Sequence, residues 1–459
     1  MREHHQDRAG ARPPSRGRIV AALFATGLLA IRFLTIGFLF APSASSAQSL
    51  EPASGSQEPG AEADGESRSR PSRYPSFTFN GFGTLGFTRS NEQGADFVAN
   101  SLRPEGPGRS DEWSPEVDSR LGLQLSADLM PRLTAVAQVV VEQTFDDDYE
   151  PTIEWANLKV SITDDLSVRI GRTALPTFLV ADHRKVGFAN PWVRPPVELY
   201  GLIPVFNSDG LDLSYRQRLG GGWGHTLQAV AGFSNVDLPG GSRAEVRDFY
   251  GLFDTFERRA LSLRTALATG RVTVDFAQPL FDFFRFFGPE GVAIADRFDV
   301  ENRRLDFASI GVGYDPGEWF VTAEGGLLRG RSLVADRTAG YVTGGRRMGD
   351  LTVHVTYSEV VVNGSIPRSG LTLSTLPPEL VPPASALNAA LDDVLTSIVE
   401  QRTVSLGLRW DFRRDVALKL QVDRIEAGRE SYGQFVNRQP GFEAGADATL
   451  ITLNCDFVF

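Results

Sequence analysis

The chain has 459 residues, enough for two or three ordinary soluble domains or for one large β-barrel. Apolar residues make up 42% and charged residues 22%, which excludes a wholly disordered chain. The slightly negative mean hydropathy excludes a bundle of membrane-spanning helices, and the net charge of −11 argues against nucleic acid as a partner. The single cysteine, Cys455, excludes an internal disulfide and a cysteine-based zinc site, and we expect it on a strand face.

The first residues have the features of a secretion signal. The apolar run IVAALFATGLLAIRFLTIGFLFAP follows a basic segment with Arg8, Arg12, Arg16 and Arg18. The small residues SASSAQ follow, so we expect a signal peptide over residues 1–47, cleaved after Ala47. Arg32 interrupts the apolar run, which leaves a retained membrane anchor as the alternative, and an upstream start-site error would explain the residues before the basic patch. Residues 48–75 are rich in Glu, Ser, Pro and Gly, which predicts a disordered leader.

From residue 76 to residue 459, segments of about ten residues alternate between apolar and polar side chains and end in turn residues. Because successive side chains of a strand point to opposite faces, each segment predicts a strand with one apolar face and one polar face. The fold class is therefore all-β and antiparallel, with about sixteen strands. These cover residues 77–87, 120–128, 133–142, 154–162, 166–170, 211–216, 226–233, 261–267, 271–276, 310–314, 319–324, 339–347, 351–358, 403–410, 416–423 and 449–459.

The links between the predicted strands alternate between short and long. Short turns are predicted at residues 128–132, 163–165, 219–224, 268–270, 315–318, 348–350 and 411–415. The other links between strands, which alternate with these turns, are mostly long, for example residues 89–117, 173–208 and 234–258. Short turns on one rim and long loops on the other are typical of outer-membrane β-barrels, whereas a propeller has no such rule.

Aromatic residues stand at both ends of the apolar strand faces. Near the short turns they are Tyr215, Tyr314, Trp319, Trp410 and Phe459, and near the long loops Phe87, Phe233, Phe276 and Tyr357. A soluble sandwich is expected to hold its aromatics in the middle of its strands, whereas a membrane barrel places them in two belts at the headgroups. The opposite faces carry many charged residues, which suits a water-filled lumen. We therefore predict a transmembrane antiparallel β-barrel rather than a soluble sheet.

Two segments carry a resemblance to a known family. FTFNGFGTLGF, residues 77–87, resembles the opening strand of Gram-negative outer-membrane porins. LNCDFVF, residues 453–459, resembles the signal that the barrel-assembly machinery reads, with Leu453, Cys455, Phe457 and Phe459 as its apolar residues. The resemblance, which spans residues 77–459, implies a general or substrate-biased diffusion porin in the bacterial outer membrane. It also implies a homotrimer in contact with outer-membrane lipid and lipopolysaccharide. In each subunit the first and last strands pair to close the barrel, and the leader before the first strand lies in the periplasm.

In porins of this size the loop after the fifth strand folds into the lumen and forms the constriction, and here that loop is residues 173–208. The resemblance assigns the constriction to six loop residues: Asp182, His183, Arg184, Lys185, Arg194 and Glu198. Charged strand residues are expected to line the pore wall: Arg120, Lys159, Arg169, Arg264 and Arg409. The familiar acidic motif of the loop is missing, so the usual ion selectivity does not carry over. A loop charge could instead fasten the loop by a salt bridge, and a wall charge could simply keep the lumen wet.

Two further segments lie in the predicted long links. The run DDDYE places Asp146, Asp147 and Asp148 together, which suits a divalent cation, a solvated face or a lipopolysaccharide-bridging site. The run SALNAALDDVLTSIVE, residues 385–400, predicts a short helix with an apolar stripe that packs on a barrel rim or plugs its mouth.

The function expected is passive diffusion of small hydrophilic solutes or ions, with no cofactor and no catalysis. One alternative is a barrel with a plugged lumen that serves as an adhesin or a structural protein. Another is a barrel enzyme, for which the histidines after the signal segment, His183, His225 and His354, lack an accompanying serine nucleophile-elbow motif.

Overall fold

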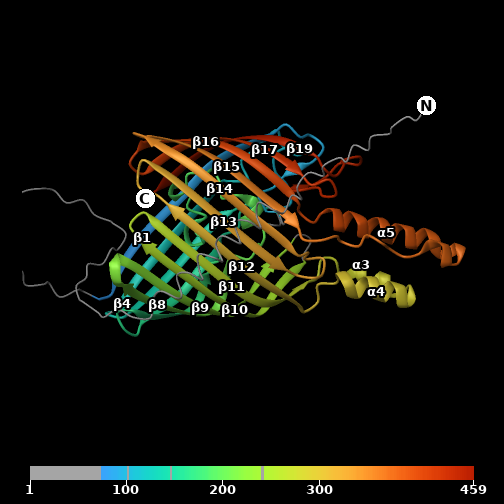
Figure 1. Cartoon of the computed structure of the whole chain (residues 1–459), viewed down its shortest axis with the longest axis horizontal. Coiled ribbons are helices and arrows are strands. Elements are labelled where there is room, and N and C mark those ends of the chain that lie inside the picture. Colours follow the sequence, from blue (N-terminus) through green and yellow to red (C-terminus); the bar gives the residue numbers. More distant parts are fainter. Residues whose placement is uncertain (1–73, 101–102, 145–146, 239–241) are drawn as a thin grey trace, which may run out of the picture.

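The computed structural model describes residues 74–100, 103–144, 147–238 and 242–459. The predicted signal peptide and the leader up to residue 73 lie outside the described residues. Within the described ranges, the main sheet has seventeen strands, and one of these, β3 (Trp113–Ser114), has only two residues. The other sixteen pair antiparallel in chain order, and β1 pairs with β19, so the sheet closes into a barrel (Figure 1). The all-β antiparallel barrel predicted from the sequence is confirmed.

The barrel strands are β1 (Ser76–Ser90), β4 (Arg120–Met130), β5 (Leu133–Glu142), β6 (Thr152–Ser161), β7 (Leu166–Ala174), β8 (Asn207–Leu219), β9 (Trp223–Asp237), β10 (Arg243–Arg258), β11 (Leu261–Val274), β12 (Arg303–Tyr314), β13 (Trp319–Arg329), β14 (Arg337–Met348), β15 (Leu351–Val362), β16 (Gln401–Arg413), β17 (Val416–Ala427) and β19 (Asp447–Val458). Outside the barrel wall, β2 (Asp96–Phe97) pairs with β18 (Phe435–Val436).

The helices lie in the links. The α-helices are α2 (Val197–Tyr200), α3 (Gln278–Arg285), α4 (Gly288–Phe298) and α5 (Val381–Thr396). The short 3-10 helices are η1 (Ala181–His183), η2 (Gly187–Ala189), η3 (Gly220–Gly222), η5 (Leu373–Thr375) and η6 (Pro378–Leu380). The helix predicted over residues 385–400 is confirmed as part of α5, which extends with α3 and α4 beyond the long-loop rim (Figure 1). None of the helices in the described part of the chain is long and apolar enough to span a membrane.

The prediction was wrong in one region, where two errors offset each other in the strand count. Residues 234–258 were expected as a long loop, yet most of them form β10. A bulge between Arg247 and Tyr250, with Asp248 at a φ of 49°, interrupts the two-residue alternation of this strand. Phe249 and Phe253 also face the interior and are buried there, so both faces of β10 carry apolar residues and its period is hidden.

The second error is the turn expected at residues 268–270. These residues continue β11, which runs unbroken from Leu261 to Val274. Gly270 lies buried against β10, where an added Cβ would come 3.3 Å from Val246 Cγ1, so this glycine marks a close approach of side chains rather than a turn.

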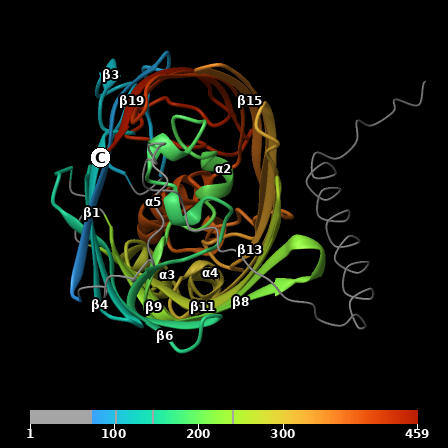
Figure 2. The same ribbon diagram turned by 90° about the vertical axis from the view of Figure 1, so that its left-hand side faces the viewer.

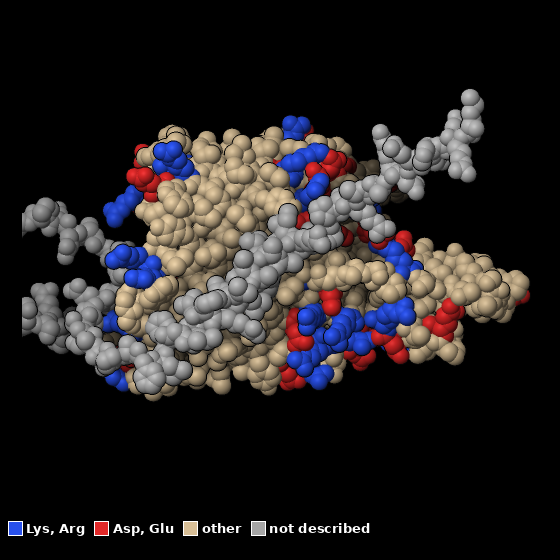
Figure 3. Space-filling model, viewed as in Figure 1, with Lys and Arg blue, Asp and Glu red and all other residues tan. Residues whose placement is uncertain are grey.

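The outer surface of the barrel is an apolar belt. On β19, Ile451 and Leu453 are exposed, whereas Thr452, Asn454 and Asp456 are buried on the inner face. All of the aromatic residues predicted for the two belts are exposed. Figure 3 shows the result on one face of the molecule, where a broad band without charged side chains separates two charged rims. The predicted orientation, with apolar side chains outward, is therefore confirmed.

The seam between β1 and β19 pairs two glycines with two aromatic rings. Gly81 donates its N–H to the carbonyl oxygen of Phe459 at 2.8 Å and accepts a hydrogen bond from the N–H of Phe459 at 3.0 Å. A Cβ added to Gly81 would lie 2.2 Å from the Phe459 ring, and one added to Gly83 would lie 2.3 Å from the Phe457 ring. The rings thus lie over the glycines and cover the backbone at the point where the barrel closes.

A valine at Gly81 tests this contact. We expect Gly81→Val to lower the free energy of unfolding by about 1 kcal/mol, because the new side chain displaces the Phe459 ring from its cross-strand partner. Urea unfolding in detergent micelles, followed by the gel mobility of the folded barrel, measures the change.

Gly344→Val is the matched control, since nothing lies within 4 Å of a Cβ added there. Phe459→Ala completes a double-mutant cycle, in which the valine at residue 81 should add no further loss once the ring is gone. Equal losses from the two valine variants would contradict the predicted role of the ring.

Candidate functional site

The segment between β7 and β8, residues 175–206, lies inside the barrel. Figure 2 shows this segment, with its helix α2, surrounded by the strands. Trp192 donates its indole N–H to Thr343 Oγ1 at 3.0 Å and to Thr356 Oγ1 at 3.1 Å, on β14 and β15. Lys419 on β17 donates to the carbonyl oxygens of Gly187 at 2.7 Å and Trp192 at 2.8 Å. We call this segment the inner loop.

Arg194 is the charged residue of the inner loop whose side chain donates the most hydrogen bonds. Its guanidinium donates to both carboxylate oxygens of Asp118, at 2.9 and 2.5 Å, and to Asp423 at 3.4 Å. It also donates to Thr88 Oγ1 at 3.1 Å and Thr452 Oγ1 at 2.9 Å, which lie on the seam strands β1 and β19. Burial opposes the charged form, but the Asp118 carboxylate overcomes this and raises the pKa of Arg194.

A second group of charges lies where the inner loop meets β5 and β6. Lys185 Nζ bridges Glu142 Oε1 at 2.9 Å and Glu154 Oε2 at 2.8 Å. Arg184 lies 3.8 Å from Glu154, and burial lowers the pKa of Arg184 to about 10 although this carboxylate opposes the shift. Glu142 also pairs with Arg120 at 3.7 Å, so cations from the loop and from the wall share the same carboxylate.

Glu198, Asp182 and His183 occupy different parts of the interior. The buried Glu198 accepts hydrogen bonds from Ser358 at 2.6 Å, from Gln401 at 2.7 Å and from Thr403, which fixes α2 to β15 and β16. Asp182 is half exposed and lies 3.9 Å from Arg264. Burial lowers the pKa of His183, and Arg264 adds to this while Asp182 opposes it, so the imidazole is neutral at pH 7 and above.

The wall residues differ in what they contact. Arg264 donates to the Phe178 carbonyl oxygen at 2.7 Å, and Arg409 donates to the Phe188 and Asn190 carbonyl oxygens at 2.6 and 2.9 Å. These two arginines therefore hold the backbone of the inner loop from opposite sides. Arg169 pairs with its wall neighbour Asp212 at 2.5 Å, and the exposed Lys159 stands opposite Arg169 in the β6–β7 register.

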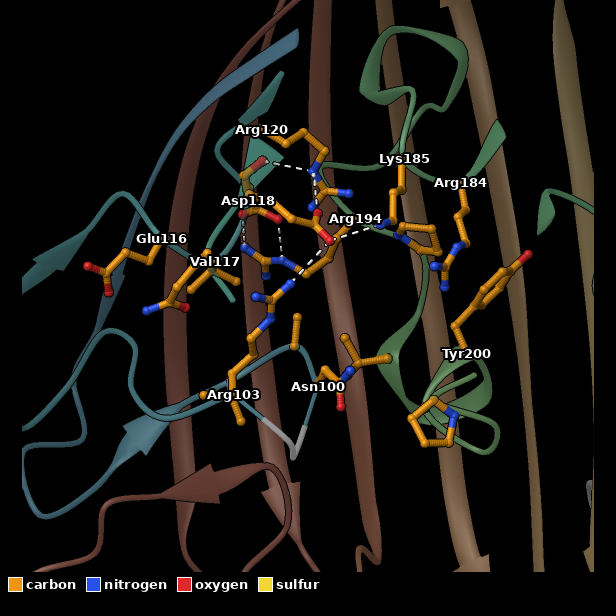
Figure 4. A pocket seen from close by; sticks show the side chains of 18 of the residues that line it. Asn100, Arg103, Glu116, Val117, Asp118, Arg120, Arg184, Lys185, Arg194 and Tyr200 are labelled. Atoms are coloured by element: carbon orange, nitrogen blue, oxygen red, sulfur yellow. Dashed lines mark hydrogen bonds and ion pairs between the residues drawn. The ribbon is translucent and has the colours of Figure 1, made fainter. Parts of the chain in front are cut away.

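The charges on one side of the inner loop surround a cavity of about 120 Å³. Figure 4 shows Arg103, Arg120, Arg184 and Lys185 converging on it, together with the Arg194–Asp118 pair. The loop between β1 and β4 supplies Arg103, and also Glu105, Glu116 and Asp118. Sequence reasoning missed this contribution, because the loop has no periodicity that shows where its charges point. The cavity is lined by residues of both signs of charge, so an electric field acts across it.

The carboxylates that the structure brings together are not the three aspartates that the sequence predicted as a metal candidate. Asp147 lies within 4.8 Å of Glu105 and Glu116, measured between ligand oxygens, whereas Asp148 accepts a hydrogen bond from Thr144 at 2.5 Å. Asp146 lies outside the described residues. Burial and the neighbouring Asp147 raise the pKa of Glu105 and of Glu116. Oxygen ligands suit a hard cation, but acidic groups often cluster without one, so a metal here stays a prediction.

The interior is not polar all round. On the side of β10 to β13, Phe253, Phe307 and Leu328 face inward and are buried. They form one apolar core with inner-loop residues such as Phe178 and Leu199. The physical reason is that the inner loop carries long apolar side chains of its own, which leave water only by packing against the wall.

No family model matches the chain, and no curated protein sequence matches it. Among solved structures, the anion-selective porin from Comamonas acidovorans is 15% identical over 84% of this chain and 100% of that chain, with a TM-score of 0.47. OmpF of Salmonella typhi, in complex with daunomycin, is 10% identical over 83% of this chain and 97% of that chain, with a TM-score of 0.49. OmpT of Vibrio cholerae, in-vitro folded and in trimer form, is 10% identical over 84% and 99%, with a TM-score of 0.47.

At these identities and scores the likeness carries no argument about function. The closed barrel of sixteen antiparallel strands, which the resemblance to Gram-negative porins implies, is confirmed by the strand pairings themselves. The roles assigned to single residues of the inner loop and the wall stay predictions.

The Arg194–Asp118 pair offers a test of what holds the inner loop. We expect Arg194→Gln to lower the free energy of unfolding by about 3 to 5 kcal/mol, because it leaves a buried carboxylate without its counterion. Adding Asp118→Asn to this variant should restore part of the loss, since the uncompensated charge is then gone. Urea unfolding in detergent micelles, followed by tryptophan fluorescence, measures both, because Trp192 lies in the same loop.

Arg424→Gln is the control, since Arg424 pairs with Asp447 on the exposed surface. An exposed pair contributes about 1 kcal/mol or less. If the two single variants lose the same amount of stability, the inner loop is not held by the buried pair.

Proposed function

We propose that the chain is an outer-membrane porin, a water-filled channel for passive diffusion of small hydrophilic solutes or ions in a Gram-negative outer membrane. The observation that carries the proposal is a barrel with an apolar outer belt whose interior holds a charge-lined cavity beside a fixed inner loop. An apolar belt stabilises the barrel in lipid, and a polar interior keeps water in the lumen.

The mechanism needs no covalent chemistry. A hydrated solute crosses because the lumen replaces the lipid with water and charged side chains, and the width and the field of the narrowest part select among solutes. This field is set by the charged side chains that line the cavity. The cations are Arg103, Arg120, Arg184 and Lys185, and the anions are Glu105, Glu116 and Glu142. Because Arg264, Arg409 and Lys419 bind the loop backbone, the gap keeps a fixed shape.

A specific observation favours a second candidate, a plugged barrel with a structural or adhesive role. The apolar core between the inner loop and the wall fills part of the interior, and α3, α4 and α5 extend from the long-loop rim. In this reading the inner loop is a plug, and the helices are the part that meets other surfaces.

The assembly and location follow the same proposal. We infer a homotrimer in contact with outer-membrane lipid and lipopolysaccharide, delivered by the barrel-assembly machinery through Leu453, Cys455, Phe457 and Phe459. The exposed outward side chains of Leu453 and Phe459 support this, since a lipid or a neighbouring subunit would cover them. Chemical cross-linking of the protein in native membranes tests the trimer.

Planar-bilayer recording of the purified protein tests the channel. We expect stepwise currents, because each inserted barrel adds one aqueous path. In a salt gradient, Arg120→Gln should shift the reversal potential toward cation preference, since it removes a positive charge from the cavity wall. Arg346→Gln is the control, because Arg346 is an exposed residue at the short-turn end of β14. A silent bilayer would instead support the plugged barrel.

Two partly buried glutamates, Glu105 and Glu116, predict a dependence on pH. Because the pKa values of Glu105 and Glu116 are raised, both carboxyls take up protons above the ordinary glutamate pKa of about 4.3. As the pH falls through these raised pKa values, the cavity loses negative charge and the reversal potential should shift toward anion preference. By the same linkage, these groups favour the folded state more at low pH and less as the pH rises through their raised pKa values.

The variant Glu105→Gln/Glu116→Gln should remove most of this shift, whereas Glu379→Gln, at an exposed residue of η6, should leave it unchanged. A shift of the same size in the double variant would assign the titration to other groups.

A further inference from the structure

A second cavity, of about 230 Å³, lies on the apolar side of the inner loop. It is bounded by the inner loop at Leu175 and at residues 202–205, and by the long-loop halves of the wall strands β9 to β14. Its lining is almost wholly apolar, and includes Val246, Phe249, Val272, Phe307 and Leu328. Pro204 lines both this cavity and the charged one, so the inner loop stands between two compartments of opposite character.

The size and lining of this cavity suit an apolar group better than water. A buried water needs only about 10 to 15 Å³ but two to four polar partners, and polar side chains are few in this lining. An apolar cavity of about 150 Å³ lined by Leu, Ile and Phe stays dry and binds benzene. The larger cavity here therefore has room for a substituted aromatic ring or a branched hydrocarbon of similar bulk.

Arg337 is the only charged residue that lines this cavity among the described residues. Its Nε is shielded from solvent and has no hydrogen-bond acceptor in the described part of the chain. The neighbouring Asp336 forms no salt bridge with Arg337 among the described residues, and its Oδ1 accepts hydrogen bonds from the Gly330 and Arg331 amides at 2.9 and 3.1 Å. A shielded guanidinium nitrogen without an acceptor is unfavourable, and the planar fork of the guanidinium matches a carboxylate or sulfonate.

We propose that this cavity binds an amphiphilic monoanion, with its carboxylate or sulfonate on Arg337 and its aromatic or branched hydrocarbon group among the apolar side chains. The cavity supplies the burial of the hydrocarbon, and Arg337 supplies the preference for a negative head group. This inference goes beyond the proposed channel and does not depend on it, because the ligand occupies the apolar side of the inner loop whether or not ions cross on the charged side.

The test compares three probes of one shape on the full chain in lipid nanodiscs, with empty nanodiscs subtracted. Isothermal titration calorimetry measures binding of 4-tert-butylbenzoate, of the neutral 4-tert-butylbenzamide and of the cationic 4-tert-butylbenzylamine. We expect the benzoate to bind about tenfold or more tightly than the amide, since a charge-assisted hydrogen bond replaces a neutral one, and the amine to bind weakest.

Two variants locate the site. Arg337→Gln should bring the benzoate to the affinity of the amide, while Arg346→Gln, at the other end of the same strand, should keep the wild-type order. Val272→Phe, which fills the cavity, should weaken all three probes. Gel mobility of the folded barrel verifies that each variant is intact. The proposal is overturned if no probe binds, if amide and benzoate bind equally to the wild type, or if Arg337→Gln keeps the benzoate preference.

Because binding is measured without current, failure of this site leaves the conductance experiment unaffected, and a silent bilayer leaves this site standing.

Discussion

The ladder between β1 and β19 is the contact on which the rest of the structure depends. It runs from the Phe82–Val458 pair to the Ser90–Leu450 pair and joins the two edges of the sheet. In lipid an unpaired edge would leave a row of amides and carbonyls without partners, so a sheet is stable there only as a closed barrel. Closure also brings Thr88 and Thr452 together, and both accept hydrogen bonds from Arg194. The position of the inner loop is therefore linked to the seam.

The inner loop shows how a long segment is held inside a barrel. On one side its charges and carbonyls are paired with wall residues, as in the bonds from Arg264 and Lys419. On the other side Phe178 and Leu199 pack in an apolar core with the wall. Glu324 joins the two modes, because it accepts hydrogen bonds from the Leu179 amide and from the Tyr200 and Tyr341 hydroxyls. The two-sided attachment divides the interior into a charged and an apolar compartment.

The sequence predicted the parts of this structure that follow a local period. The alternation of β19 placed Leu453 outward and Thr452 inward, because the pleat alone decides this. It did not predict β10, since Phe253 faces the inner core and removes the contrast between the two faces. Nor did it find the Arg194–Asp118 pair, whose members are 76 residues apart in the chain and meet only once the barrel has closed. Contacts of this kind depend on tertiary distances that no period records.

Two arginines inside the barrel have opposite surroundings. Arg194 has two carboxylates and two hydroxyls around its guanidinium, so its hydrogen-bonding capacity is used within the fold and it holds the loop in place. Arg337 lines an apolar cavity, and its Nε lacks an acceptor among the described residues. Since a shielded nitrogen without an acceptor opposes folding, the place of Arg337 beside an apolar cavity supports the proposed anionic ligand. The inner loop thus carries a paired charge on one side, where it is fixed to the wall, and faces the arginine proposed for binding on its other side.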